Sequence, residues 1–134
     1  ASLSGRNFGW SRMEGMGHCL GFGAPCDDPS FTWPIWEYDH GVGCSISGGV
    51  CYRGKAFPWL AGRYLFSDYC SAFLHILRVD RDRVAEAEDA TPWLKALDID
   101  QIVALAEDSS GEVVVVSQAG TVARLEARAA FSGR

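Results

Sequence analysis

The chain has 134 residues, of which 48% are hydrophobic and 22% charged, a composition that excludes the disordered and fibrous classes and fits a globular domain. Its formal net charge of -5 lacks the basic field that binding to a phosphate backbone needs, so we expect no nucleic-acid partner. No apolar run approaches the about 18 residues that span a bilayer, and residues 1–4 do not resemble a signal peptide. We therefore expect no membrane span and, if the protein is exported, a signal already removed.

The first thirty residues are rich in glycine with interleaved aromatic residues, and they show neither helical nor strand periodicity. Cys19 and Cys26 flank a short Gly/Pro stretch that a disulfide between them could close. We therefore predict an ordered, disulfide-pinned loop. From residue 33 to 38 the pattern changes to a short extended segment, whose proline favours an edge position in a sheet. Residues 1–43 are thus predicted to form a loop followed by an edge strand.

Three short segments rich in β-branched and aromatic residues come next and predict a meander of strands. They are Ile46–Arg53, Arg63–Ser67 and Phe73–Val79. A longer hairpin loop at 54–62 separates the first two. The segment 84–90 fits either a fourth strand or one helical turn. Cys44 and Cys70 bracket the first predicted strand pair.

The last third of the chain repeats this pattern with three more short segments. They are Ile102–Ala106, Val113–Val116 and Thr121–Leu125. Two such sheets in tandem predict an all-β protein built as part of a β-propeller, treated as one unit over residues 1–134. The first blade is expected over 44–98 and an incomplete last blade over 99–127, followed by a tail at 128–134. A β-sandwich is the structural alternative, because short strands at these intervals suit either architecture.

Five cysteines in a chain of this length favour an oxidising compartment, and their spacing contains no CxxC pair of the kind that builds zinc or redox sites. Disulfides are the better interpretation, and we expect a secreted or periplasmic protein. Cys51 is the odd cysteine. It lies in a run of alternating apolar residues, which favours a buried free thiol over a reactive one.

Several motifs follow one another along almost the whole chain. They are GRNFGW at 5–10, MEG at 13–15, HC at 18–19, PIWEYDH at 34–40, GCSISGG at 43–49, YRG at 52–54, GRYLFSDYCS at 62–71, ED at 107–108, GEV at 111–113 and GTV at 120–122. In this order they resemble the C-terminal region of the soluble glucose/sorbosone dehydrogenase family. These are quinoprotein sugar dehydrogenases, and the family includes proteins similar to the hedgehog-interacting protein.

The resemblance implies a six-bladed β-propeller, of which this chain supplies about the last two blades. It also supports the disulfide pairs Cys19–Cys26 and Cys44–Cys70. For complete members of the family it implies oxidoreductase activity on a sugar with pyrroloquinoline quinone (PQQ) and calcium. The catalytic residues of those members come from earlier blades, so the catalytic residues of this chain stay unknown.

The resemblance does not extend to the family's quinone-binding cations, a Lys and two Arg, in the region that this chain covers. By strand alignment, Cys70 stands at the Lys position, and Gln101 and Val103 stand near the Arg pair. The segment 98–107 contains no Lys or Arg at all. Binding a tricarboxylate requires such cations, so we expect no PQQ on this chain alone.

Three polar residues are candidates for the top face or central channel of the implied ring. Asp68 follows a predicted strand, His40 lies in a Gly-rich turn, and Glu37 precedes that turn. For His40, a hydrogen bond within the loop competes with a titrating role. We expect no metal site, since Asp27–Asp28 and Asp80–Asp82 lack the spacing of a calcium loop.

Four tryptophans could form a platform for a sugar ring, although packing between blades is the commoner role of tryptophan in a propeller. They are Trp10, Trp33, Trp36 and Trp59. Since a blade buries its faces only against other blades, we expect partners. These are the remaining blades of a sugar dehydrogenase-like protein or other copies of this chain, three of which would complete a ring. A carbohydrate- or protein-binding extracellular module is the further alternative.

Overall fold

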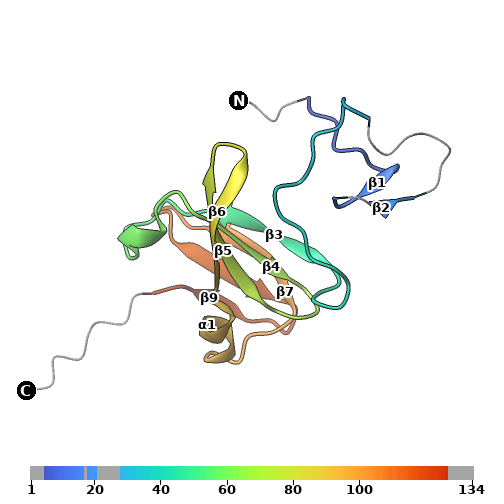
Figure 1. The fold of residues 1–134 in the computed structure, drawn as a ribbon. Coiled ribbons are helices and arrows are strands. Elements are labelled where there is room, and N and C mark those ends of the chain that lie inside the picture. The colour runs from blue at the N-terminus through green and yellow to red at the C-terminus, as the bar shows by residue number, and fades with distance from the viewer. Residues whose placement is uncertain (1–4, 17, 21–27, 127–134) are drawn as a thin grey trace, which may run out of the picture. The chain divides into compact units, whose positions relative to one another are not determined.

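The computed structural model describes residues 5–16, 18–20 and 28–126, and these fall into two compact units, one within 1–38 and one within 39–134 (Figure 1). The first unit holds a two-stranded antiparallel ribbon of β1 (Met13–Glu14) and β2 (His18–Cys19). A single bridge joins Asn7 to Phe31. The edge strand predicted over 33–38 is absent from the described residues. Pro34 has no backbone N–H with which to join a ladder, which is one reason for this difference.

The second unit begins with a four-stranded antiparallel sheet in which neighbours in sequence are neighbours in space. Its strands are β3 (Ile46–Cys51), β4 (Tyr64–Asp68), β5 (Leu74–Asp80) and β6 (Arg83–Asp89). The segment 84–90, for which strand and helical turn both remained open, is therefore mainly strand. The loop between β3 and β4 carries a 3-10 turn, η1 (Pro58–Leu60).

A short helix, α1 (Thr91–Lys95), leads into a three-stranded antiparallel sheet. Its strands are β7 (Ile102–Glu107), β8 (Val113–Ser117) and β9 (Val122–Arg124). The all-β prediction is confirmed, and each of the six segments predicted as strands within 46–79 and 102–125 contains a strand. The helix α1 was not predicted from the sequence.

The two sheets enclose one apolar core (Figure 1). Alternation along each strand sends every second side chain into it. From the first sheet come Leu65, Leu74 and Ile76, and from the second Ile102, Leu105, Val113 and Val115. Leu60 of η1 and Leu94 of α1 close the core, and both are fully buried. The first strands of the two sheets, β3 and β7, lie against each other.

Candidate functional site

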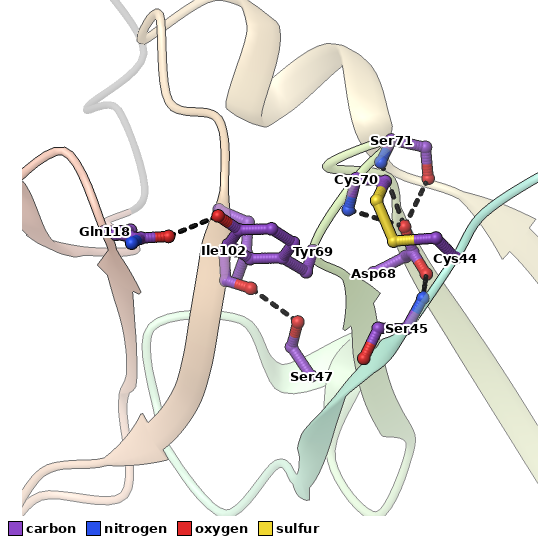
Figure 2. Close-up of a disulfide and its surroundings, with 9 residues drawn as sticks. All are labelled: Cys44, Ser45, Ser47, Asp68, Tyr69, Cys70, Ser71, Ile102 and Gln118. Carbon is purple, nitrogen blue, oxygen red and sulfur yellow. Dashed lines mark hydrogen bonds between the residues drawn. A yellow bond between two sulfur atoms is a disulfide. The ribbon is translucent and has the colours of Figure 1, made fainter.

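Asp68 ends β4 with a side chain that is 0% exposed, and its carboxylate binds the backbone on both sides of it (Figure 2). Oδ2 accepts the N–H of Ser45 at 2.7 Å. Oδ1 accepts the N–H of Cys70 at 2.8 Å and both the N–H and the hydroxyl of Ser71 at 2.9 and 3.1 Å. A buried carboxylate is tolerated when hydrogen bonds replace its lost hydration. Asp68 therefore ties the start of β3 to the β4–β5 turn.

The disulfide between Cys44 and Cys70 lies beside this carboxylate (Figure 2). The two Cα atoms are 5.6 Å apart, within the ordinary range for a disulfide. Both cysteines are exposed, whereas Asp68 is buried behind them. The predicted Cys44–Cys70 pair is confirmed.

Segments of the second sheet reach the same end of the unit (Figure 2). The hydroxyl of Ser47 donates a hydrogen bond to the carbonyl of Ile102, where β7 begins. The hydroxyl of Tyr69 donates to the side-chain oxygen of Gln118 in the β8–β9 turn. We call this end the disulfide end; it comprises residues 44–45, 68–72, 98–101 and 117–120.

A shallow pocket of about 200 Å³ lies at the disulfide end between the β4–β5 turn and the segment that follows α1. It is lined by Ser71, Ala72, Lys95, Asp98, Ile99 and Asp100. Two of these residues, Ala72 and Asp98, have positive φ values of 49° and 53°, and Gln101 nearby has 45°. Non-glycine residues adopt this conformation at a cost, and such residues gather at functional sites. The pocket therefore combines three charged residues with a backbone that is strained at two of its positions.

The three positions that the resemblance aligns with quinone-binding cations carry no cation. Cys70 is in a disulfide, while Gln101 and Val103 carry no charge. Among the described residues of this end the charged groups are carboxylates, and one ammonium, that of Lys95, lines the pocket beside two of them. Such a surface would repel carboxylates of a ligand.

A second buried carboxylate, that of Glu112, lies at the opposite end of β3 and was not singled out in the sequence. Its side chain is 4% exposed and accepts the hydroxyl of Tyr52 at 2.6 Å. It also accepts the backbone N–H groups of Lys55 and Ala56 at 2.7 and 2.9 Å. A Cβ on Gly54 would stand 2.5 Å from the Glu112 carboxylate, so only glycine lets the loop approach this closely. The contact joins the β3–β4 loop to the second sheet.

The electrostatics of this contact follow from its hydrogen bonds. The hydroxyl of Tyr52, followed by the N–H of Ala56, lowers the pKa of Glu112 below its ordinary value. Burial, followed by the hydrogen bond to Glu112, raises the pKa of Tyr52. The pair is therefore ionised on Glu112 and protonated on Tyr52 at neutral pH. An acid at the head of the apolar run of β8, preceded by Gly111, was the sequence signal available for it.

The other predicted site residues lie as follows. Glu37 is exposed in the first unit, where its carboxylate accepts the backbone N–H of Met16. His40 is exposed in a turn of the second unit that is closed by hydrogen bonds to the carbonyl of Asp39. The three candidates are thus found in different settings, with Asp68 at the disulfide end.

The remaining cysteines divide between the two units. Cys51 is a free, half-buried thiol on β3. Cys19 is in a disulfide, and its predicted partner Cys26 lies outside the described residues.

Trp59 meets the ring of Trp93 edge-on at 5.8 Å, beneath the guanidinium of Arg63. Trp59 therefore helps to pack the β3–β4 loop against α1. Trp10, Trp33 and Trp36 belong to the first unit and are exposed.

No family model matches the chain. Among the described residues, no helix has the length and apolar character to cross a bilayer.

Proposed function

We propose that this chain is the C-terminal part of an extracytoplasmic β-propeller that resembles the soluble glucose/sorbosone dehydrogenases, and that it does not catalyse sugar oxidation by itself. Its role is to supply about two blades to a ring. The Cys44–Cys70 disulfide supports an oxidising compartment. Tyr52, Asp68 and Glu112 lie within motifs that carry the resemblance, and they make the structural contacts described above.

The arrangement of the two sheets is the observation that carries the proposal. Each sheet is a meander in chain order, and the first strand of each, β3 and β7, lies against the other. Both strands begin at the disulfide end, since Ser47 of β3 bonds the carbonyl of Ile102 at the start of β7. Propeller blades have this form, with the first strands of successive blades running in the same direction near the axis. In a β-sandwich, by contrast, the face of each sheet that points away from the shared core would be the solvent-exposed surface of the protein.

The surface chemistry of the disulfide end supports a non-catalytic role. The cations that would neutralise a tricarboxylate are missing from the three positions named above, and Asp98 and Asp100 make the pocket more acidic. Function is argued from the site and not from the fold. A structural role as part of a ring does not require a bound cofactor.

Two measurements test the proposal. The purified chain, supplied with PQQ, calcium and glucose, is expected to reduce no dye above the rate of the quinone alone, and turnover by the isolated chain would contradict the non-catalytic role. The chain is also expected to associate in solution, either with itself or with added earlier blades of a related protein. A stable, folded monomer that binds no such blades would refute the proposal that the chain completes a ring.

Self-assembly is the alternative that a specific observation favours. On the side of the second sheet that faces away from the core, Val116 lies opposite Val122, and Val122 is 69% exposed. Among the described strands, β9 has a neighbour on one side alone. An apolar face beside an open strand edge favours association, and heterologous association can close into a ring. A solution mass of three chains would select this alternative.

A further inference from the structure

The first unit contains a pocket of about 360 Å³, which we call the first-unit pocket. Its lining residues belong to two segments of the chain, 7–12 and 28–31. Sites for small organic molecules commonly have volumes of about 300–1,000 Å³. The first-unit pocket therefore has the size of a site for one small molecule.

Backbone hydrogen bonds hold the lining of this pocket in place. The N–H of Thr32 donates to the carbonyl of Asn7 at 2.7 Å, which joins the two segments. The N–H groups of Arg12 and Met13 both donate to the carbonyl of Gly9, at 2.7 and 2.9 Å. Gly9 has a φ of 85°, and a Cβ there would stand 2.9 Å from the side chain of Met13, so the turn requires glycine. These contacts fix the shape of the lining.

Two opposite charges line the pocket. The carboxylate of Asp28 accepts the N–H of Ser30 at 2.9 Å. Hydrogen bonds from the hydroxyl and the N–H of Ser30, and after them the positive charge of Arg12, lower the pKa of Asp28, so this carboxylate is ionised at neutral pH. The ion pairs of the described residues do not include one between Arg12 and Asp28. The pocket therefore presents a cation and an anion that are not in direct contact with each other.

An aromatic side chain supplies the apolar part of the lining. Trp10 is 79% exposed, so most of its ring is available to a ligand. Phe31, which also lines the pocket, is 9% exposed and is covered mainly by the chain itself. Covering exposed apolar surface is favourable by about 25 cal/mol per Å². A ligand with an apolar group would therefore gain affinity from Trp10.

We propose that the first-unit pocket binds a free α-amino acid with a large apolar side chain, in its zwitterionic form. The guanidinium of Arg12 receives the carboxylate, since its planar fork matches the two carboxylate oxygens. Asp28 receives the ammonium, and Trp10 covers the side chain. An ion of one sign would be repelled by one of the two charged residues. A neutral ligand such as a sugar would leave both of them without a charged partner.

This inference is independent of the proposed function, because the residues that carry it all belong to the first unit. The full chain is titrated with L-phenylalanine at neutral pH in a calorimeter, and saturable binding of one molecule per chain is expected. Phenylalaninamide lacks the carboxylate and N-acetyl-phenylalanine lacks the ammonium. Each is expected to bind at least about tenfold more weakly, as for the loss of a hydrogen bond to a charged group. No saturation by L-phenylalanine up to about 10 mM, or equal binding of all three compounds or of glucose, would overturn the proposal.

Substitutions assign the two charged contacts. Arg12→Gln is expected to remove the preference for phenylalanine over its amide, and Asp28→Asn the preference over the N-acetyl compound. Arg6→Gln removes an arginine of the same unit that does not line the pocket, and it should leave the affinity unchanged. Retention of both preferences by the two pocket variants would contradict the assignment. The three compounds test the same contacts on the unaltered chain if a variant does not fold.

Discussion

Two buried carboxylates organise the second unit at its opposite ends. Asp68 binds backbone N–H groups that flank the disulfide, and Glu112 binds those of the β3–β4 loop. Each joins segments that lie far apart in the sequence. Removing one partner of such a contact leaves a buried charge or dipole without its hydrogen bond, which costs more than the bond itself contributes.

Replacement of Tyr52 by Phe tests the contact with Glu112. The variant loses the hydrogen bond that Tyr52 donates to Glu112 and the one that it accepts from the N–H of Phe57. We expect the free energy of unfolding to fall by about 1.5–3 kcal/mol, as for a hydrogen bond to a charged group. Urea denaturation measures it. Tyr64→Phe, at a side chain that is 39% exposed, is the matched control and should change the midpoint little.

The pH dependence of stability provides a second test. Since the pKa of folded Glu112 is lowered, the unfolded chain binds more protons in acid, and stability is lost as pH falls from the unfolded value of about 4.3 through the folded one. Glu112→Gln removes this contribution. We expect its urea midpoint to fall less steeply than that of the parent between about pH 5 and 3. Asp108, whose pKa is also lowered by the hydroxyl of Ser110, keeps some slope in both chains. Parallel profiles would contradict the role given to Glu112.

The shortest elements depend on packing and not on their own propensity. The helix α1 has five residues, fewer than an isolated helix needs in water. Leu94 anchors it in the core, and Thr91 accepts the N–H of Leu74 through its hydroxyl. Pro92 in the first turn suits a helix start, because the missing N–H has no partner there. The helix is therefore stabilised by its packing against the two sheets and not by its own propensity.

Leu94→Ala tests this dependence. Truncating a fully buried leucine leaves a cavity, and we expect the free energy of unfolding to fall by about 2–5 kcal/mol. Leu97→Ala, three residues along at a side chain that is 56% exposed, should have a small effect. Equal effects of the two substitutions on the thermal midpoint would show that α1 does not belong to the core.

At the scale of the whole molecule, the second unit has a shared core but two unlike outer faces. On the side of the first sheet that faces away from this core, the buried ring of Phe66 stacks against Tyr64 and His75. The second sheet presents small aliphatic side chains, among them Val116 and Val122. Faces of different chemistry suit head-to-tail association, in which the same contact repeats around an axis.

Val122→Glu tests self-association. A carboxylate at this position of the edge strand β9 would have to be buried without a partner in any assembly that uses the apolar face of the second sheet. We expect light scattering to show a shift from the assembled mass toward the monomer. Leu97→Glu adds the same charge at an exposed position outside the sheets and should leave the mass unchanged. An assembly that tolerates Val122→Glu does not use this face.

The sequence predicted the parts of the fold that depend on local pattern. The strands followed from short runs of β-branched and aromatic residues, as in Val113–Val116, and the Cys44–Cys70 pair followed from its position around two strands. The prediction of an edge strand at 33–38 was wrong, because a strand needs a hydrogen-bonded neighbouring strand and a local pattern does not show whether one is present. Glu112 was missed for the same reason: its importance comes from Tyr52, sixty residues away. Asp68 was recognised as a site residue, yet its carboxylate is buried beneath the disulfide and binds backbone.

The residues alone determined the runs of β-branched and aromatic residues, the turn positions and the absence of Lys and Arg from residues 98–107, because these are properties of neighbours along the chain. The tertiary structure decided which polar groups are buried, which sheets share a core and which sulfur atoms lie beside a carboxylate. Those outcomes depend on contacts between residues far apart in sequence, and their energies arise when water is removed from between them.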